Sequence, residues 1–353
     1  MSSDSSSDSS FERRKQDHIR LALDPINQAA GGSGLDRIEL RHEALPDLDF
    51  HDISIRTKVL GKDVPVPFFV SSMTAGHAQG EGLNLVLARA CQARGWPMGV
   101  GSQRKQLTST AAANEWKQIR KLAPDVLMMG NIGISQVITS DVAQVQKLAD
   151  SVGAFAMIVH TNPLQEVLQP EGTPMFKGSL AALEKLAKAL PIPVILKETG
   201  CGFSRETLKR LLATGIAAVD VSGYGGTHWG RLEGQRSSRT DMRYVTAQTF
   251  AQWGVSTAES LLNAVELKPR FEVWASGGVR SGLDAAKLLA MGATTVGFAK
   301  PVLEAALQGV QALEAEMQRL EFELKTALFC TGSQDLAALR SNSLWRIKDG
   351  PPA

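Results

Sequence analysis

A short polar run between residues 160 and 166 combines side chains that suit a metal-bound diphosphate. It reads His160-Thr161-Asn162-Pro163-Leu164-Gln165-Glu166, with an imidazole, two amides and a carboxylate. A carboxylate is a hard oxygen ligand for Mg2+, and an imidazole or amide N–H can donate to phosphate oxygens. Because no second acidic residue lies close by, we expect Mg2+ to be held by Glu166 together with substrate phosphates. Taken alone, His160 would more often be a satisfied core residue and Glu166 a solvated carboxylate.

Two glycine-containing segments later in the chain suit a phosphate group. They read Ser276-Gly277-Gly278-Val279-Arg280-Ser281-Gly282-Leu283-Asp284 and Gly292-Ala293-Thr294-Thr295-Val296-Gly297-Phe298-Ala299-Lys300. Glycines let a backbone approach a phosphate closely, and a helix that begins at Ser281 would offer free N–H groups to an anion. The alternative is that these glycines only form tight turns. The pattern SGGVRxGxDxxK resembles the phosphate loop of FMN-binding barrels, which favours the phosphate interpretation.

Lys197 ends an apolar run and should therefore point into the protein interior. A lysine in an apolar surrounding needs an anionic partner or a functional reason. Beside a flavin, its ammonium would stabilise negative charge on the pyrimidine end of the reduced ring. The alternative is a structural ion pair with Glu198 or with another carboxylate of the interior.

A basic group near the N-terminus could bind an anion with several charges. Arg14, Lys15 and His18 lie on one face of a predicted helix, and Arg104 could join them. The alternative is a solvated basic face.

The elements that position these side chains are eight short apolar runs, each followed by a polar, glycine-containing signature. Such runs, separated by helical patterns, are typical of buried parallel strands, and eight of them predict a (β/α)8 barrel whose active site lies at the carboxyl ends of the strands. The runs are 66–72, 96–101, 125–130, 154–160, 192–197, 216–222, 271–276 and 294–299.

The rest of the chain is expected to extend this barrel. We expect a disordered tail at 1–10, an N-terminal extension at 11–63 with a helix over 11–24 and a short hairpin at the barrel floor, the barrel over 64–340 and a tail at 341–353. Helical patterns cover 80–94, 109–122, 140–151, 178–190, 204–213, 244–265, 281–291, 302–328 and 334–340. Two long connections, 161–178 and 223–243, should lie over the active site.

Bulk composition excludes several classes of protein. A net charge of +2 without a basic run argues against nucleic-acid binding, and no apolar stretch is long enough to span a membrane. Three cysteines without a Cys-x-x-Cys pair, and the absence of a signal sequence, predict a cytoplasmic protein with free thiols. Cys201 would need an activating base to serve as a nucleophile.

Taken together, the motifs resemble those of type 2 isopentenyl-diphosphate isomerases, which are FMN-dependent. The resemblance covers about residues 11–340. It departs from the family pattern at Ala75, where SSMTGG is usual. The matching motifs are RKxxH, SSMT, GSQR, GNIG, HxNPLQE, KExGxG, SGxGGTxW and SGGVR, which begin at residues 14, 71, 101, 130, 160, 197, 222 and 276.

This resemblance implies a role for each matching residue, with Gln165 relaying or orienting a proton at FMN and Glu166 binding Mg2+. Substrate would contact Arg14, Lys15, His18, Ser102, Gln103, Arg104, His160, Asn162 and Gln165. FMN would contact Ser71, Ser72, Met73, Thr74, Ser102, Asn131, Lys197, Ser222, Thr227, Gly277, Gly278, Val279, Arg280, Ala299 and Lys300.

The implied reaction interconverts isopentenyl and dimethylallyl diphosphate without net oxidation. NADPH would serve only to reduce FMN, since no Gly-x-Gly-x-x-Gly dinucleotide fingerprint is present. The resemblance also implies a homotetramer or a larger assembly.

Two alternatives remain. An FMN-dependent 2-hydroxyacid oxidase would need a His and an Arg in an HGGR pattern, where this chain has Tyr224-Gly225-Gly226-Thr227. A non-catalytic phosphate-binding barrel would not need polar signatures after all eight strands.

Overall fold

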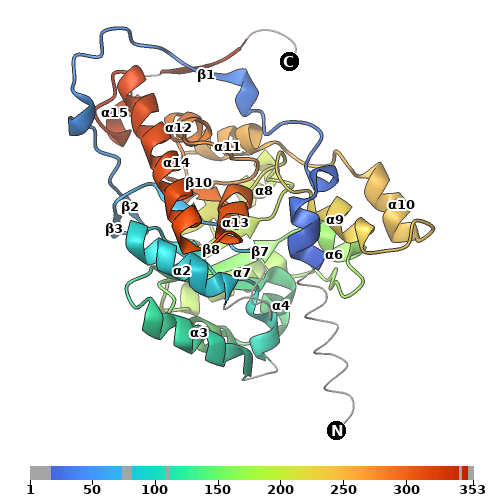
Figure 1. Cartoon of the computed structure of the whole chain (residues 1–353). Coiled ribbons are helices and arrows are strands. Elements are labelled where there is room, and N and C mark those ends of the chain that lie inside the picture. Colours follow the sequence, from blue (N-terminus) through green and yellow to red (C-terminus); the bar gives the residue numbers. More distant parts are fainter. Residues whose placement is uncertain (1–16, 74–81, 108–110, 342–343, 349–353) are drawn as a thin grey trace.

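Eight parallel strands form a closed barrel at the centre of the molecule (Figure 1). The computed structural model describes residues 17–73, 82–107, 111–341 and 344–348. Each apolar run of the sequence overlaps one strand, and the predicted (β/α)8 barrel is confirmed. The barrel strands are β4 (Phe68–Val70), β5 (Met98–Gly99), β6 (Met128–Gly133), β7 (Ala156–Thr161), β8 (Val194–Glu198), β9 (Ala218–Asp220), β10 (Glu272–Ala275) and β11 (Thr295–Phe298).

Helices surround the barrel, and the long helix α14 packs against α2, α12 and α13. The helices between the early strands are α2 (Leu83–Arg94), α3 (Ala111–Leu122), α4 (Ile134–Thr139), α5 (Val142–Ser151), α6 (Pro163–Leu168), α7 (Ser179–Ala189) and α8 (Arg205–Leu211). The later helices are α9 (Trp229–Gln235), α10 (Met242–Thr249), α11 (Thr257–Val265), α12 (Gly282–Ala290), α13 (Lys300–Ala306), α14 (Val310–Cys330) and α15 (Leu336–Ser341). Within the described residues, no helix has the length and apolar character needed to cross a membrane.

Two expected helices are each divided into two. The range 244–265 is divided between α10, which begins two residues earlier, and α11, because Gly254 adopts a φ of 148° and the Ser256 side chain caps a new helix. The range 302–328 contains α13 and α14, which are separated by Gly309 at a φ of 108°. A positive φ interrupts a right-handed helix, and hydrophobic periodicity alone does not reveal that interruption.

The floor of the barrel is closed by the expected hairpin, formed by β2 (Thr57–Val59) and β3 (Lys62–Val64). Val59 and Val64 are buried and pack against the apolar side chains of the barrel interior, among them Trp274. Glu272 fixes the hairpin to β10, because its carboxylate accepts hydrogen bonds from the Leu60 N–H (2.9 Å) and the Trp274 indole N–H (2.8 Å). The active end of the barrel is therefore the opposite one.

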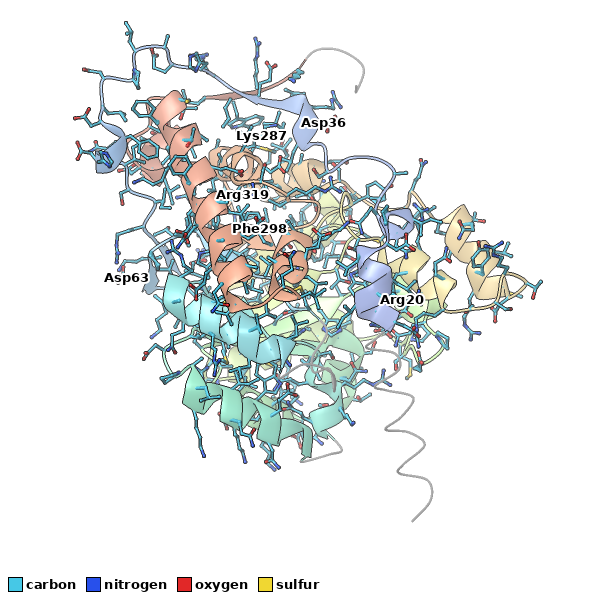
Figure 2. All side chains as sticks on the ribbon, viewed as in Figure 1. Arg20, Asp36, Asp63, Lys287, Phe298 and Arg319 are labelled. Carbon is cyan, nitrogen blue, oxygen red and sulfur yellow. The ribbon has the colours of Figure 1, made fainter. Side chains whose placement is uncertain are left out.

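The two ends of the chain pair with each other outside the barrel. Strand β1 (Ile38–Leu40) lies antiparallel to β12 (Trp345–Ile347), which falls within the region expected to be a C-terminal tail. The N-terminal segment is also fixed to α12, because Lys287 Nζ donates to the Leu35 carbonyl at 2.7 Å (Figure 2). The helix at 17–23 is thereby placed near α6 and α9, over the barrel mouth (Figure 1).

Candidate active site

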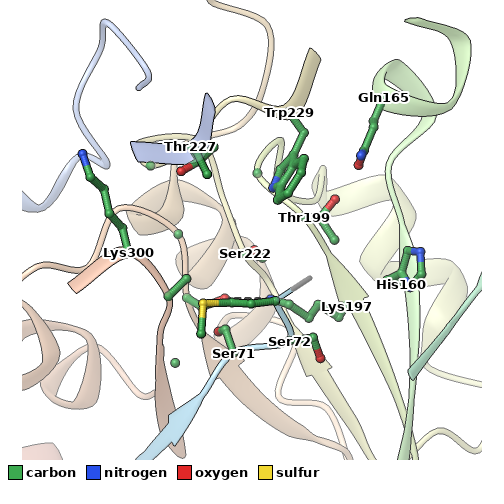
Figure 3. Close-up of a pocket in the computed structure, with 18 of the residues that line it drawn as sticks. Ser71, Ser72, His160, Gln165, Lys197, Thr199, Ser222, Thr227, Trp229 and Lys300 are labelled. Atoms are coloured by element: carbon green, nitrogen blue, oxygen red, sulfur yellow. Dashed lines mark hydrogen bonds between the residues drawn. The ribbon is translucent and has the colours of Figure 1, made fainter. Parts of the chain in front are cut away.

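A pocket of about 250 Å³ opens at the carboxyl ends of the barrel strands (Figure 3). Residues that follow all eight strands contribute to it, together with the N-terminal helix. The predicted site residues that line it are His18, Ser71, Ser72, Met73, Ser102, Arg104, Asn131, His160, Gln165, Glu166, Lys197, Ser222, Thr227, Gly277, Gly278, Val279, Arg280, Ala299 and Lys300.

Five other predicted residues are not among those that line the pocket. Arg14, Lys15 and Thr74 lie outside the described residues. Gln103 is 1% exposed and turns into the protein, where its amide accepts from the Asn131 N–H and donates to the Leu148 carbonyl. Asn162 is also buried and serves as the N-cap of α6.

Lys197 on the pocket floor forms a buried ion pair. Its ammonium lies 2.5 Å from Asp220 Oδ2 and donates to Ser276 Oγ at 3.0 Å. The sequence left Glu198 or another interior carboxylate as possible ion-pair partners of Lys197. The structure shows that the partner is Asp220. Lys197 still lines the pocket, so the ion pair does not remove it from contact with a ligand.

The serines after β4 have unsatisfied hydroxyl groups. Ser71 Oγ and Ser72 Oγ are buried, and neither has a hydrogen-bond partner among the described residues. A buried polar atom without a partner costs free energy, so both hydroxyls are suited to a ligand bound on the floor. Ser222, across the floor from them, adopts a φ of 35°, a backbone conformation that non-glycine residues rarely hold outside functional sites.

The loop after β10 forms a cradle that only glycine permits. Gly277 and Gly278 have φ values of 96° and 70°, and a Cβ on Gly278 would lie 2.5 Å from the Gly225 carbonyl oxygen. The two glycines therefore let this loop pack closely against the backbone of Gly223 and Gly225, and both also line the pocket.

The expected anion site at the start of α12 is not free. The Gly282 N–H donates to Glu323 Oε2 at 2.6 Å, and the Arg280 N–H donates to Asp284 Oδ2 at 3.1 Å. The Ser281 hydroxyl caps the Asp284 N–H. Two N–H groups in the first turn of this helix, those of Gly282 and Asp284, are thus already paired within the protein and are not free for an anion.

The pocket has two chemically different sides (Figure 3). Lys300 lies on one side, whereas His160 and Gln165 lie on the other. The floor between them carries Ser71, Ser72, Lys197 and Ser222, and the glycine cradle also lines the pocket. A long ligand with a phosphate near Lys300 can therefore reach the polar run after β7.

His160 is neutral in this environment. Burial, and then the positive charge of Lys197, lowers the pKa of His160 to about 4. Its Nδ1 lies 2.8 Å from Asn131 Oδ1, and the Asn131 amide is oriented by donating to the Val100 carbonyl at 3.0 Å. Nδ1 therefore carries the proton, and Nε2 is left as an acceptor.

Gln165 belongs to a hydrogen-bonded cluster centred on Glu233 of α9. Gln165 Nε2 donates to Glu233 Oε1 at 3.1 Å, His18 Nε2 lies 3.0 Å from the same oxygen, and Arg236 donates to Oε2 at 2.7 Å. Burial raises the pKa of Glu233, but the hydrogen bonds and charges of His18 and Arg236 prevail and lower it. Glu233 is therefore an ionised carboxylate that orients both Gln165 and the N-terminal helix. His18 also packs edge-on against Trp229, with 5.2 Å between ring centroids.

Glu166 follows Gln165 on α6, at the rim of the pocket. Its Oε2 accepts the Thr173 N–H at 2.6 Å. The described residues contain no cluster of three or more His, Cys, Asp or Glu side chains that could enclose a metal ion.

Sequence reasoning missed several residues of the site. Asp220 had a visible signal, because an acidic residue inside the apolar run 216–222 needs a buried partner. Gln28 and Trp229 also line the pocket. Trp229 ends the SGxGGTxW motif but was given no role, and a glutamine in a loop has no distinctive spacing. Cys201 is not a pocket residue, and burial raises the pKa of its thiol, which disfavours the reactive thiolate.

Comparison with known proteins agrees with this arrangement. The FMN-dependent dehydrogenase family matches residues 21–132 and 144–346. An isopentenyl-diphosphate delta-isomerase from Bdellovibrio bacteriovorus is 56% identical over 342 residues, with 96% of this chain and 99% of the relative covered. The chain belongs to the isopentenyl-diphosphate delta-isomerase family. Family members from Legionella pneumophila (strain Corby) and a Synechococcus species are 55% and 41% identical and cover at least 95% of both chains.

Solved structures share the isomerase's fold at greater distance. A mandelate oxidase variant bound to (S)-mandelic acid superposes with a TM-score of 0.66 and 18% identity, covering 97% of this chain and 98% of that one. At this identity the likeness shows the fold alone. The local residues differ from the pattern that an oxidase would need. Tyr224 stands in place of the required histidine, and its hydroxyl accepts the Gly31 N–H at 3.2 Å, outside the pocket lining.

Proposed function

We propose that this chain interconverts isopentenyl and dimethylallyl diphosphate on a bound, reduced FMN. The observation that carries the proposal is the 56% identity to an isopentenyl-diphosphate delta-isomerase across nearly the whole chain. The pocket supports it, because one side suits the FMN phosphate and the other suits a Mg2+-diphosphate. An oxidase is disfavoured by Tyr224, and a phosphate-binding scaffold would not need the Gln165–Glu233 cluster.

The residues present fit FMN. The Gly277–Gly278 cradle and Lys300 would hold the phosphate, and Ser71, Ser72 and Lys197 would hold the ring along the floor. The unsatisfied serine hydroxyls are the most specific support, since a flat polar ring would give both a partner. The other described residues predicted to contact FMN, including Asn131, Ser222 and Thr227, line the same cavity.

The substrate would bind on the side of His18, Arg104 and His160. Glu166 would bind Mg2+ together with the diphosphate oxygens. Because His160 Nε2 is an acceptor, it would bind a Mg2+-bound water or a hydroxylated phosphate rather than a bare oxygen. Arg14 and Lys15 would add positive charge, and NADPH would serve only to reduce FMN.

Moving a double bond requires a proton to be added at one end of the alkene and another to be removed from an allylic carbon. Reduced FMN supplies a transferable proton at N5 and an electron-rich face. Glu233 fixes the Gln165 amide, which orients or relays the proton but is too weak an acid to supply it. Trp229 and the N-terminal helix cover the mouth and exclude water from a cationic species.

We also infer a cytoplasmic homo-oligomer, a tetramer or larger. The described cysteines are all unpaired, which suits a reducing compartment. Met242 and Trp253, on and beside α10, are 81% and 60% exposed, and such apolar side chains suit a subunit contact.

The direct test follows substrate conversion by proton NMR under anaerobic conditions. FMN-loaded protein, photoreduced and supplied with Mg2+, is expected to convert isopentenyl to dimethylallyl diphosphate to a fixed equilibrium ratio from either side. In D2O, product should acquire deuterium at the carbon that becomes a methyl group. Oxidised protein without reductant is the control and should be inactive. A protein that binds reduced FMN but converts neither isomer would refute the proposal.

A further inference from the structure

Three buried polar side chains from consecutive strands meet at the pocket floor. Lys197 on β8, Asp220 on β9 and Ser276 just after β10 are 4%, 1% and 3% exposed. Lys197 Nζ lies 2.5 Å from Asp220 Oδ2, and Ser276 Oγ donates to Asp220 Oδ1 at 2.8 Å. The positions are set by the barrel itself, because Lys197 and Asp220 are partners in the register of adjacent strands.

Asp220 differs from the other two in its position relative to the pocket. Lys197 and Ser276 line the cavity, whereas Asp220 lies behind them. Burying a charged pair carries a desolvation penalty that a well-packed apolar pair would avoid. The carboxylate is further anchored by the Ser222 N–H at 3.3 Å, so it is held by three groups in one orientation. This arrangement fixes the position of the Lys197 ammonium, and the Asp220 carboxylate balances its positive charge.

We propose that Asp220 is a positioning residue that holds the Lys197 ammonium under the bound flavin and offsets its positive charge at the ring. This inference rests on the proposed binding of FMN along the floor. A lone lysine there would strongly favour the reduced flavin, which carries more negative charge than the oxidised one. The paired lysine donates a hydrogen bond but presents little net charge. The flavin ring can thus be reduced, but its reduced anionic form is not strongly stabilised over the oxidised form.

The test is the FMN reduction potential of variants, measured at pH 7 without substrate. Asp220→Asn removes the charge with little change in shape. We expect the affinity for reduced FMN relative to that for oxidised FMN to rise at least tenfold. For a two-electron couple, a tenfold rise raises the reduction potential by about 30 mV. The matched control is Glu198→Gln. Burial raises the pKa of Glu198 to about 8, so this neighbouring carboxyl is mostly protonated at pH 7 and its loss should change the ratio less than twofold.

A double-variant cycle keeps the proposal testable if Asp220→Asn does not fold or load FMN. Lys197→Met alone should lower the potential, because the aspartate is then unbalanced. The double variant Lys197→Met/Asp220→Asn should return towards the wild-type value, because both charges are gone. An unchanged or lowered potential in Asp220→Asn, or a double variant equal to Lys197→Met, would overturn the proposal. Neither readout depends on isomerase activity, so a failed isomerase assay would leave this result standing.

Discussion

At the residue scale, the active side of the pocket depends on ionisation states that burial sets. His160 has a pKa lowered to about 4, so it is neutral at any pH where the protein would work, while Glu233 is held ionised by His18 and Arg236. Because His160 is neutral, the positive charge for a diphosphate must come from other side chains. Arg104, which lines the pocket, and Arg14 and Lys15, which lie outside the described residues, would supply that charge.

Glu166 carries the residue-scale prediction about the metal. Glu166→Gln should abolish Mg2+-dependent turnover, because an amide oxygen lacks the charge that holds Mg2+ against a diphosphate. FMN should remain bound, since Lys300 lies on the side of the pocket opposite Gln165, the neighbour of Glu166 on α6. Activity is measured over a Mg2+ titration, and FMN content by absorbance. Full Mg2+-dependent activity, or loss of FMN on purification, would contradict the assignment.

At the element scale, α6 positions both Gln165 and Glu166, and its start depends on a single cap. The Asn162 side chain accepts the Gln165 N–H at 2.9 Å and donates to Thr199 Oγ1 at 3.1 Å, and Pro163 occupies the first turn. Asn162→Ala should lower the free energy of unfolding by about 1–2 kcal/mol. It should also lower kcat, because α6 then loses its fixed orientation.

Asn162→Ser is the matched control, since serine retains the cap but not the contact to Thr199. Urea unfolding and steady-state kinetics compare the variants. A fully active Asn162→Ala protein would show that the cap does not position the site.

Glu198, the last residue of β8, carries a prediction about the pH dependence of stability. Burial raises the pKa of Glu198 from 4.5 to about 8, although the Cys201 and Gly202 N–H groups donate to its carboxylate. The native state therefore holds this proton more tightly than the unfolded chain. The contribution of this proton to the free energy of unfolding is fully present below pH 4.5 and is lost as the pH rises to about 8. The free energy of unfolding should fall over this range by on the order of 2–5 kcal/mol.

Glu198→Gln should remove this part of the pH dependence, because glutamine keeps the acceptor but not the ionisation. The free energy of unfolding, measured by denaturant titration from pH 5 to 9, would be flatter in the variant. Parallel pH curves for the two proteins would contradict the assignment.

Sequence patterns predicted the barrel and most of the pocket residues because both depend on local signals. Apolar runs mark buried strands, and parallel strands deliver their polar ends to one edge. The partners of those residues were less accessible. The Lys197–Asp220 pair joins two strands, and Glu233 on α9 contacts Gln165 on α6. Because the partners come from different elements, no regular spacing in the sequence reveals either contact. The occupied N-terminus of α12 depends on Glu323 from α14, which is distant in the chain.

At the scale of the whole molecule, the two ends of the chain stabilise each other away from the pocket. Strand β12 covers β1, and the Arg41 and Lys348 N–H groups add hydrogen bonds at 2.6 and 2.8 Å to the Leu344 and Arg37 carbonyls. A chain that ends at residue 343 should therefore have a Tm lower by about 2 °C or more than one that ends at residue 348. FMN affinity should be unchanged, because none of these residues lines the pocket. Equal Tm values by calorimetry would refute this role.

The central claim, redox-neutral isomerisation on reduced FMN, is tested most directly by electron counting. The FMN-loaded protein is reduced with one equivalent of NADPH under strict anaerobiosis and given a large excess of isopentenyl diphosphate and Mg2+. NADPH absorbance and dimethylallyl diphosphate are followed together. We predict many product molecules formed for each NADPH oxidised, with turnover continuing after NADPH is exhausted. One NADPH consumed per product molecule would mean a reductase and would contradict the account.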